Sequence, residues 1–206
     1  MSALAVNHHA DHPGFSGVAG SLFALMFLLT GRAGADLAAK LTGIGAGDHL
    51  VDIGCGPGTA ARVAAGRGAR VTGVDPSASM LRVARLVTRR NTGISWAEGS
   101  AEALPVTDSS ATVVWALATV HHWQDVAAGI AEAQRVLAPG GRLLAVERQS
   151  KPDATGVASH GWTRQQAETF AALCRSAGML DVAVANRRAG RRPVWVVSAA
   201  AVARKS

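Results

Sequence analysis

The sequence predicts an α/β protein with a doubly wound, mostly parallel, seven-stranded sheet that ends in an antiparallel hairpin. Short apolar runs alternate with helical segments along most of the chain, as in parallel sheets with helices on both faces. A glycine-rich turn follows the first of these runs. The last two runs, 180–185 and 194–199, are too close in sequence for a crossover helix, so they are expected to pair as a hairpin.

The first run and its glycine turn lie in the segment 50–76, which is predicted to form a strand, a turn, a helix and a second strand. The first strand is short and apolar, as a buried parallel strand requires. Gly54, Gly56 and Gly58 follow it at alternate positions. Without Cβ atoms they allow a sharp turn and a close approach of the backbone to a ligand. The segment is therefore predicted to bind a nucleotide.

Two aspartates give this segment its chemistry. Asp75 follows the second strand, Arg70–Val74, about 20 residues after the glycines, where an acid can accept hydrogen bonds from ribose hydroxyls. Asp52 directly precedes the glycines. Its carboxylate would repel a pyrophosphate over the turn but would hold a ligand that carries an ammonium group. The pair predicts a nucleoside ligand with a cationic end.

Several motifs occur in an order that is more specific than any one of them. They are Asp52 with Gly54, Gly56 and Gly58, then Asp75, then GSAEALP from Gly99, and RVLAPGGRLLAV from Arg135. In this order they resemble the class I S-adenosylmethionine-dependent methyltransferases, in particular the small-molecule branch that includes the ubiquinone and menaquinone C-methyltransferases. The resemblance covers Gly43 to Ser198. It implies a Rossmann-like methyltransferase fold with S-adenosyl-L-methionine as cofactor; a Rossmann domain for another nucleotide is the alternative.

By this resemblance, the cofactor contacts fall on the glycine turn, the end of the second strand and two later turns. The residues so assigned are Asp52, Gly54, Cys55, Gly56, Gly58, Asp75, Pro76, Ser100, Ala101, Glu102 and Thr119. The family commonly has an acid where this chain has Ser100, so the adenine amino group would meet a hydroxyl without that charge. Ala101 would donate its backbone N–H to the ring, whereas Glu102 is better explained as a surface or helix-start residue. No metal is expected in this pocket.

The composition indicates one globular domain. The chain has 206 residues, of which 49% are hydrophobic and 17% charged, enough for a single core. Residues 43–206 are expected to form the cofactor-binding core, after an amino-terminal arm and lid helices in residues 1–42. The net charge of +7 is almost all arginine; it favours anionic partners but is discounted as a sign of nucleic-acid binding. Cys55 and Cys174 indicate neither a disulfide framework nor a metal site, which fits a cytoplasmic protein.

The amino-terminal segment 1–13 is polar and holds a group of potential metal ligands, His8, His9, Asp11 and His12. The segment has no apolar periodicity that would fix their geometry. A loosely packed arm is therefore the favoured interpretation, and a metal site is the alternative.

An uncharged, partly apolar segment, 14–30, follows. We expect neither a membrane span nor a signal peptide, because its dense apolar part is about half of the ~20 residues that a span requires and no basic region precedes it. By the family resemblance, Ser21–Leu29 is expected to form a lid helix over the pocket, and Gly31–Leu41 a second helix leading into the core. The lid side chains expected to face the pocket are Phe23, Met26 and Phe27.

The predicted fourth strand, Thr112–Ala116, opens into the sequence LATVHHW, residues 117–123. In a doubly wound sheet the substrate lies beyond the carboxyl ends of the strands, so Thr119, His121 and His122 are expected near the transferred methyl group. Methyl transfer needs a nucleophile held about 3 to 3.5 Å from the carbon, and a base only if the acceptor carries a proton. Histidine is the natural base at neutral pH. Two interpretations follow. Either one of the histidines acts on the substrate, with His121 favoured over His122, or both form hydrogen bonds that shape the pocket.

The remaining elements follow from sequence pattern. Helices are predicted over 76–90, over 125–137, and from Thr163, where Gln166 completes a capping box, to Ser176; strands are predicted over 94–98 and 142–146. Pro139, Gly140 and Gly141 are expected to separate the second of these helices from the fifth strand. Arg187, Arg188, Arg191 and Arg192 are expected in the hairpin turn, as a solvated loop or as an anion-facing patch.

The predicted pocket is completed by three residues that follow the fifth strand in sequence. Glu147 could face the pocket as a second base or pair with Arg148, and the ion pair is favoured. His160 and Trp162, at the end of the loop that follows, are expected to close one side of a small pocket.

The sequence therefore predicts transfer of a methyl group to an oxygen or carbon of a small-molecule or lipid-like acceptor. A catalytically silent cofactor-binding protein, with a regulatory or scaffold role, is the alternative from another class. Nucleic-acid methylation is less favoured, because residues 117–123 lack the Asn/Asp-Pro-Pro-aromatic run that is usual in such members. No nucleic-acid partner is expected, and a homodimer is left open.

Overall fold

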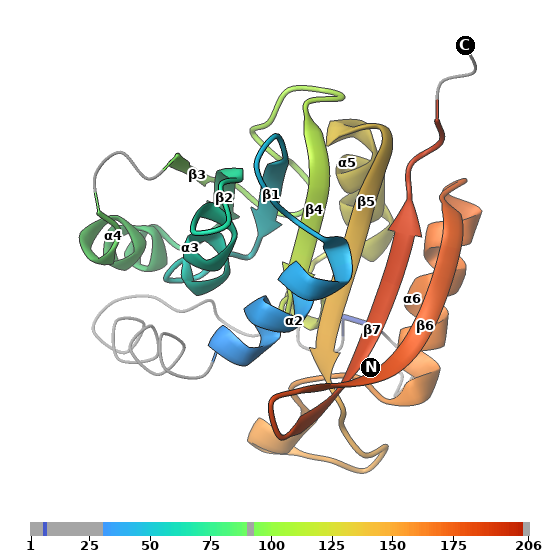
Figure 1. Cartoon of the computed structure of the whole chain (residues 1–206). Coiled ribbons are helices and arrows are strands. Elements are labelled where there is room, and N and C mark those ends of the chain that lie inside the picture. Colours follow the sequence, from blue (N-terminus) through green and yellow to red (C-terminus); the bar gives the residue numbers. More distant parts are fainter. Residues whose placement is uncertain (1–5, 8–30, 90–92, 204–206) are drawn as a thin grey trace.

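The computed structural model describes residues 6–7, 31–89 and 93–203 (Figure 1). Outside the described residues lie the predicted lid helix Ser21–Leu29 with Phe23, Met26 and Phe27, and the group His8, His9, Asp11 and His12. The interpretations of these segments stay predictions.

Within the described residues, seven strands form one sheet. In chain order they are β1 (His49–Ile53), β2 (Arg70–Asp75), β3 (Ile94–Glu98), β4 (Ala111–Leu117), β5 (Leu137–Arg148), β6 (Leu180–Ala189) and β7 (Arg192–Ala200). Their spatial order is β3-β2-β1-β4-β5-β7-β6 (Figure 1). The first five strands pair in parallel, and β7 runs antiparallel to both β5 and β6. The predicted fold class, with its carboxyl-terminal antiparallel pair, is confirmed.

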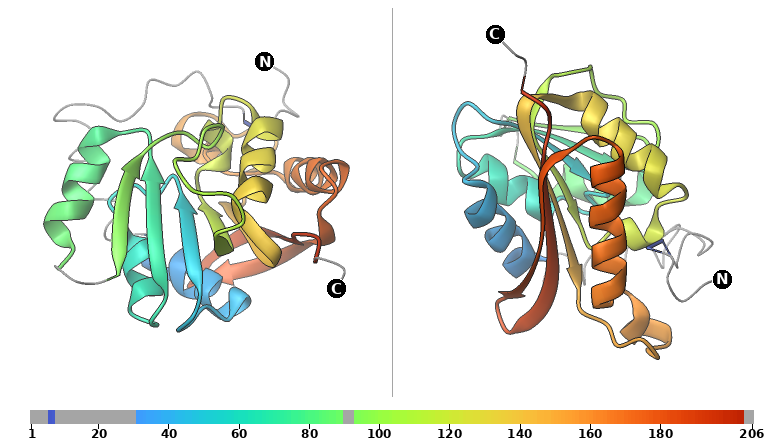
Figure 2. Two further views of the ribbon diagram at one scale, coloured as in Figure 1. Left: turned by 90° about the horizontal axis from the view of Figure 1, so that it is seen from above. Right: turned by 90° about the vertical axis from the view of Figure 1, so that its right-hand side faces the viewer.

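Helices cover both faces of this sheet. Those described are α2 (Arg32–Thr42), α3 (Thr59–Ala65), α4 (Ala78–Val87), α5 (Val126–Val136) and α6 (Arg164–Ser176), with 3-10 turns η1 (Val120–His122) and η2 (Gly156–Ser159). In Figure 2, α2 and α3 lie on one side of the sheet, and α5 and α6 lie on the other. The sheet is therefore the middle of three layers, as in other doubly wound proteins.

The central strand β1 shows why both faces need a cover. All five of its residues are buried. Leu50 packs in a cluster with Ala61 of α3, whereas Val51 and Ile53 pack in a second cluster with Ile130 of α5. Successive side chains of a strand point to opposite faces, so a continuous apolar run suits a strand between two helical layers.

Helix α2 confirms that a helix forms over most of the predicted segment Gly31–Leu41, whereas the assignment of this segment to the lid stays a prediction. Ala35, Ala38 and Ala39 on its buried side are fully inaccessible to solvent. Their small side chains let the helix lie close to α3, and it also contacts β4, β5 and β6. The helix ends at Gly43, which adopts the left-handed conformation common at helix carboxyl termini. Residues 32–42 thus belong to the layer that covers this face of the core.

The predicted start of the fifth strand is wrong. We expected Pro139, Gly140 and Gly141 to form a break before a strand beginning at Arg142, but β5 begins at Leu137. Leu137 already pairs with Ala111 of β4, and an irregularity in the register after that pair accommodates the proline and glycines. The strand therefore starts directly at the end of α5.

The predicted hairpin is confirmed, but its strands are longer than expected. β6 continues to Ala189 and β7 begins at Arg192, with a tight turn between them. Arg187 and Arg188 therefore lie in β6 and Arg192 in β7, whereas Arg191 lies in the turn. The strands extend because backbone pairing continues through Arg187 with Val194 and Arg188 with Pro193.

Helix α6 confirms the predicted capping box. The Thr163 side chain accepts a hydrogen bond from the Gln166 backbone, and the Gln166 side chain accepts one from the Thr163 N–H.

Among the described helices, none is both long enough and apolar enough to cross a membrane.

Candidate functional site

The glycine turn lies where the carboxyl ends of the parallel strands meet. Ile53, the last residue of β1, pairs with Val74 of β2. The backbone N–H groups of Gly54 and Cys55 both donate to the Val74 carbonyl, at 2.8 and 3.0 Å. These bonds tie the turn to β2 and bring its residues next to Asp75.

Asp75 holds the turn from the neighbouring strand. It is 7% exposed; its Oδ2 accepts a 2.8 Å bond from the Gly56 N–H, and its Oδ1 accepts a 2.9 Å bond from the Ser77 N–H. Burial raises the pKa of Asp75, while these two N–H donors counteract the rise. Each carboxylate oxygen can accept a second hydrogen bond. Asp75 therefore shapes the glycine turn and still has acceptor capacity for a ligand.

Asp52, at the same edge of the sheet, has a carboxylate oxygen that lacks a hydrogen-bond partner among the described residues. It is 2% exposed, and its Oδ2 is buried without a hydrogen-bond partner among the described residues. Burial, and secondarily the nearby Asp75, raise the pKa of Asp52 to about 7, although a backbone hydrogen bond from Ala61 lowers it. A buried polar atom without a partner is costly, so its retention points to a donor that the described residues do not supply, such as a bound ligand.

The three glycines of the turn differ in what surrounds them, although all three have positive φ. A Cβ atom on Gly54 would lie 2.1 Å from Thr119 Oγ1, and one on Gly58 would lie 2.1 Å from a Trp96 ring carbon. A Cβ atom on Gly56 would meet nothing within 4 Å among the described residues. Gly54 and Gly58 are thus required by packing within the protein, whereas Gly56 borders open space that a ligand could fill.

The turn after β3 is formed as expected, and Glu102 in this turn contacts the start of α5. Ser100 forms an isolated bridge with Ala103, and Ala101 is buried. Glu102 Oε1 accepts from the N–H groups of Gln124 and Asp125, at 2.8 and 3.2 Å. These bonds hold the start of α5, which agrees with the favoured interpretation of Glu102 as a helix-start residue; its assignment to the cofactor contacts stays a prediction.

Two other assigned residues flank the aspartates. Cys55 is buried, and burial raises the pKa of its thiol well above the usual range, which suits a packing role. Pro76 is exposed directly after Asp75.

Glu147 organises the other half of this edge. Its side chain is fully buried; Oε1 accepts a 2.9 Å bond from the Val120 N–H, and Oε2 lies 2.9 Å from His121 Nδ1. The favoured pairing of Glu147 with Arg148 is wrong, since Arg148 Nε instead donates to the His160 carbonyl. Neighbouring residues of a strand point to opposite faces, which separates the two side chains. Glu147 thus fixes both the backbone of η1 and the ring of His121.

The structure brings a third histidine to the predicted pair. The ring centroids of His121 and His122 are 4.1 Å apart, and the His160 ring lies 5.5 Å from each of them. His121 is 3% exposed, and the other two are half-buried. The loop after β5 therefore brings His160 next to this pair, and its assignment to a substrate pocket stays a prediction.

Trp162 does not share that position. It is fully buried, its ring lies 5.1 Å from that of Phe170, and its Nε1 donates to the Val6 carbonyl. The prediction that Trp162 lines the pocket is corrected, because so large an apolar ring packs in the core beneath the loop.

Sequence reasoning missed Trp96, which fills the space beside the glycine turn. Trp96 of β3 pairs directly with Gly73 of β2, and a Cβ atom on Gly73 would lie 2.5 Å from its ring. The same ring covers Gly58. The sequence pattern that could have indicated this contact is a glycine inside one predicted strand and an aromatic residue in the following strand. When two such residues pair, the aromatic ring covers the backbone of the glycine.

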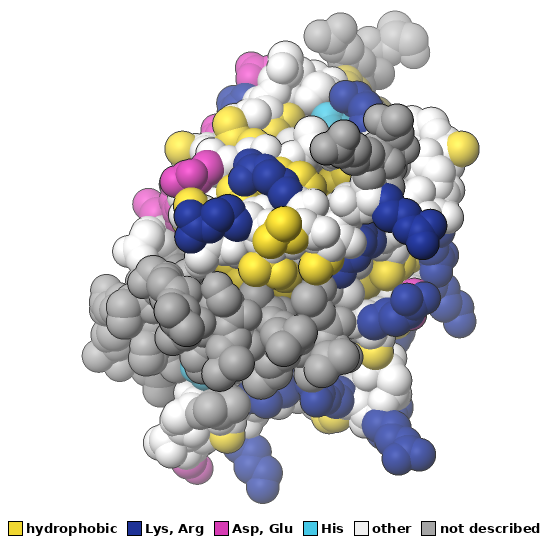
Figure 3. Space-filling model, turned by 90° about the vertical axis from the view of Figure 1, so that its left-hand side faces the viewer, with side chains coloured by type: hydrophobic (Ala, Val, Ile, Leu, Met, Phe, Trp, Pro, Cys, Tyr) yellow, Lys and Arg dark blue, Asp and Glu magenta, His cyan; other side chains and the backbone are white. Residues whose placement is uncertain are grey.

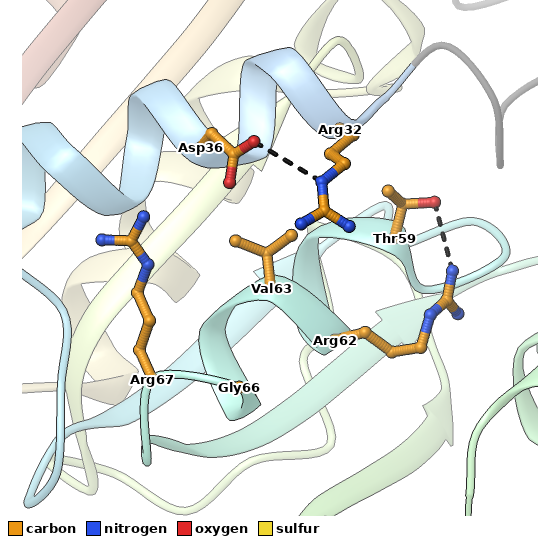
Figure 4. Close-up of a pocket in the computed structure, with 7 residues that line it drawn as sticks. All are labelled: Arg32, Asp36, Thr59, Arg62, Val63, Gly66 and Arg67. Carbon is orange, nitrogen blue, oxygen red and sulfur yellow. Dashed lines mark hydrogen bonds and ion pairs between the residues drawn. The ribbon is translucent and has the colours of Figure 1, made fainter.

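A cavity of about 380 Å³ lies between α2 and α3, outside the edge that holds the aspartates (Figure 4). It is lined by Arg32, Asp36, Thr59, Arg62, Val63, Gly66 and Arg67. Arg32 pairs with Asp36 at 3.7 Å, and Arg62 donates to the Pro57 carbonyl at 2.8 Å. The excess of arginines makes this cavity basic, so it does not suit the cationic ligand for which Asp52 is placed.

Positive side chains of the described residues can be followed on one face of the molecule (Figure 3). On the face shown in Figure 3, lysine and arginine side chains occur at several separate places and not as one continuous stripe.

A sheet of this strand order, with a glycine turn after β1 and an acid at the end of β2, defines the class I, Rossmann-like methyltransferase fold. Residues 51–145 match the family model described as "Methyltransferase domain". The segment thus extends from β1 to β5 and contains both aspartates, the glycine turn and the two adjacent histidines. This matched segment, residues 51–145, is thus a methyltransferase domain of the kind that the sequence motifs resemble.

Named relatives agree with this. A demethylmenaquinone methyltransferase of Tropheryma whipplei is 36% identical over 110 residues, which cover 53% of this chain and 46% of the relative. A malonyl-[acyl-carrier protein] O-methyltransferase of Serratia marcescens is 34% identical over 68% of this chain and 52% of its own length. A crystal structure of a SAM-dependent methyltransferase from Aquifex aeolicus superposes with a TM-score of 0.72 at 15% identity, covering 88% of this chain and 98% of that chain. The chain thus matches about half the length of these curated relatives.

Proposed function

We propose that this protein is an S-adenosylmethionine-dependent methyltransferase that acts on a small molecule. The observation that carries this proposal is the buried Asp52 carboxyl group, whose Oδ2 has no partner among the described residues, directly before the glycine turn. A cationic donor would satisfy that oxygen, whereas a pyrophosphate would be repelled by it. This favours a cofactor with an ammonium group over a dinucleotide.

The residues present fit this cofactor at three points. Asp52 would pair with the ammonium group, the open space beside Gly56 would admit the ligand against the backbone, and Asp75 would accept from the ribose hydroxyls. Ser100 and Ala101 would border the adenine. When bound, S-adenosylmethionine supplies an electrophilic sulfonium methyl group.

The acceptor would lie on the β4–β5 side of the same edge. With a Glu147 oxygen accepting from Nδ1, His121 carries its proton there, so Nε2 is the nitrogen that can accept a proton from a hydroxyl acceptor. A carbon acceptor would need no base, and His121 would then shape the pocket. His122 and His160 border the same space.

The acceptor is proposed to be small or lipid-like, with oxygen or carbon receiving the methyl group. The names of relatives support both atoms, since they include a ubiquinone/menaquinone biosynthesis C-methyltransferase and a malonyl-[acyl-carrier protein] O-methyltransferase. The cytoplasmic location and the homodimer remain predictions, and no nucleic-acid partner is proposed.

Calorimetry with S-adenosylmethionine and its demethylated product tests the cofactor. Both should bind wild-type protein, and Asp75→Ala should weaken binding about 30-fold or more, because it removes a charged acceptor worth roughly 2–3 kcal/mol. Asp75 also holds Gly56 and Ser77, so a thermal melt of the variant must show that it stays folded. Wild-type affinity in a folded Asp75→Ala protein would remove the ribose assignment.

Turnover separates an enzyme from a silent cofactor-binding protein. The protein is incubated with cofactor and a cell extract, and mass spectrometry then searches for products one methyl group heavier. A new methylated compound supports the enzyme and identifies its acceptor. Cofactor binding without any such product across extracts would favour the regulatory or scaffold role.

A further inference from the structure

Three histidines from two separate loops converge at the β4–β5 edge. His121 and His122 belong to η1, after β4, and His160 ends the loop that follows β5. One potential ligand nitrogen from each lies within 4.8 Å of the others. No local sequence pattern predicts this convergence, because His160 is distant along the chain from the other two.

Glu147 provides the feature that metal-bound histidines usually have. Its Oε2 accepts from His121 Nδ1 at 2.9 Å, inside a fully buried environment. A metal-ligating histidine commonly donates its second ring N–H to a carboxylate, which fixes the tautomer and makes the other nitrogen a better ligand. His121 therefore presents Nε2 as its ligand atom, with the ring already oriented.

We propose that His121, His122 and His160 form a binding site for a divalent transition-metal ion, with Zn²⁺ as the best match. Three imidazoles suit zinc and its borderline-soft neighbours, and they do not suit Mg²⁺ or Ca²⁺, which prefer oxygen ligands. A site with three protein ligands leaves a fourth position for water or for an oxygen of another molecule. This departs from the expectation, made on the sequence, that the pocket holds no metal.

The spacing of the nitrogens is close to what the metal needs. With Zn–N bonds of about 2.0–2.1 Å, tetrahedral ligand nitrogens lie roughly 3.3 Å apart. The present limit of 4.8 Å therefore requires a contraction that rotation of the two half-buried rings, His122 and His160, can supply. His121, which Glu147 holds, would serve as the fixed member.

This site is independent of the proposed methyl transfer, since metal binding needs no cofactor. The location of the metal site, beyond the carboxyl ends of β4 and β5, has a consequence for catalysis only if the protein is a methyltransferase as proposed. In that case the open metal position would hold an oxygen of the acceptor, and His121 Nε2 would serve as a metal ligand in place of a base.

The test uses the full-length protein after treatment with a chelator. Zn²⁺ affinity is measured by calorimetry, and Co²⁺ is used as a spectroscopic probe, because tetrahedral Co²⁺ absorbs strongly in the visible range. Because His8, His9 and His12 could also bind metal, a variant with these three changed to alanine is the reference. His122→Ala and His160→Asn are then introduced singly into that reference, since both side chains are half-buried and their loss should leave the fold intact.

We expect one Zn²⁺ per chain in the reference protein, with at least about 100-fold weaker binding in each single variant and loss of the Co²⁺ absorption. Glu147→Gln should weaken binding about 10- to 100-fold, as expected when the partner of a ligating histidine is changed. The proposal is overturned if the reference protein binds no Zn²⁺ below about 10 μM. It is also overturned if binding survives His122→Ala and His160→Asn unchanged. Cofactor affinity measured without metal reports separately on the proposed function.

Discussion

Asp52 near the end of β1 and Glu147 near the end of β5 are both buried at the same edge of the sheet, but their carboxylate oxygens differ in their hydrogen-bond partners. Both Glu147 oxygens have partners within the chain, the Val120 N–H and the His121 ring. Asp52 keeps one oxygen without a partner among the described residues, and its pKa is raised to about 7.

This difference indicates that Glu147 stabilises the fold, whereas Asp52 is placed to bind a ligand. A buried acid whose hydrogen bonds are complete stabilises the structure around it, and its loss leaves its partners unsatisfied. A buried acid with an open oxygen destabilises the free protein and gains when a cation binds. Glu147 and Asp52 should therefore respond in opposite ways to substitution.

The largest effect is expected for Glu147→Ala. The substitution leaves the Val120 N–H and the buried His121 ring without their partner, which should lower the free energy of unfolding by about 3–5 kcal/mol. Urea denaturation followed by circular dichroism measures this. Glu168→Ala is the matched control, because Glu168 is exposed and its one ion pair among the described residues, with Arg164, is long at 4.0 Å. This substitution should change the free energy of unfolding by less than about 0.5 kcal/mol. Equal stability of the two variants would contradict the role given to Glu147.

Asp52→Asn should act in the opposite direction. The folded pKa of about 7 lies above the ordinary 3.8, so the neutral form is favoured in the folded state and stability is lost as pH rises from about 4 through 7. At pH 8, where wild type holds a buried charge, the neutral asparagine should stabilise the free protein by about 2–3 kcal/mol. The gain should shrink as the pH is lowered toward 4. Thermal melts across this range measure it, and a variant less stable than wild type at pH 8 would remove the contrast with Glu147.

The smallest stability effect is expected for Gly56→Ala, which tests the open space between the two aspartates. Gly56 has φ of 51°, and an added Cβ atom would meet nothing within 4 Å among the described residues, so alanine should cost only about 1 kcal/mol of stability, for the backbone conformation. Gly47→Ala is the control, because Gly47 also has positive φ and open surroundings but lies before β1. Both variants should remain folded, and only Gly56→Ala should lose cofactor affinity. Equal cofactor affinity in the two would show that the space beside Gly56 is not the ligand site.

The Asp52 half of the edge could be predicted from sequence and the Glu147 half could not, for a physical reason. The glycine turn and Asp75 belong to one continuous βαβ unit, so their order along the chain nearly determines their positions in space. The strands and the capping box of Thr163 follow equally local rules.

The His121 half depends on contacts between distant segments. Whether Glu147 faces Arg148 or His121 is decided by the side of β5 that faces η1, and a shift of one residue would reverse it. The approach of His160 depends on the path of the loop after β5, which no local pattern specifies. Trp162 was misplaced for the same reason, since a tryptophan in a loop can cover a pocket or fill the core.

Whether Asp52 holds the cofactor is best decided by the affinity for S-adenosylmethionine as a function of pH, in wild type and in Asp52→Asn. If Asp52 binds the ammonium group, wild-type affinity should rise about tenfold from pH 6 to pH 8, because the carboxyl group must lose its proton before it can pair with a cation. Asp52→Asn should bind about 10- to 100-fold more weakly at pH 8 and show no such dependence. Wild-type affinity in the variant, with the same pH profile, would contradict the assignment of Asp52 to the ammonium group.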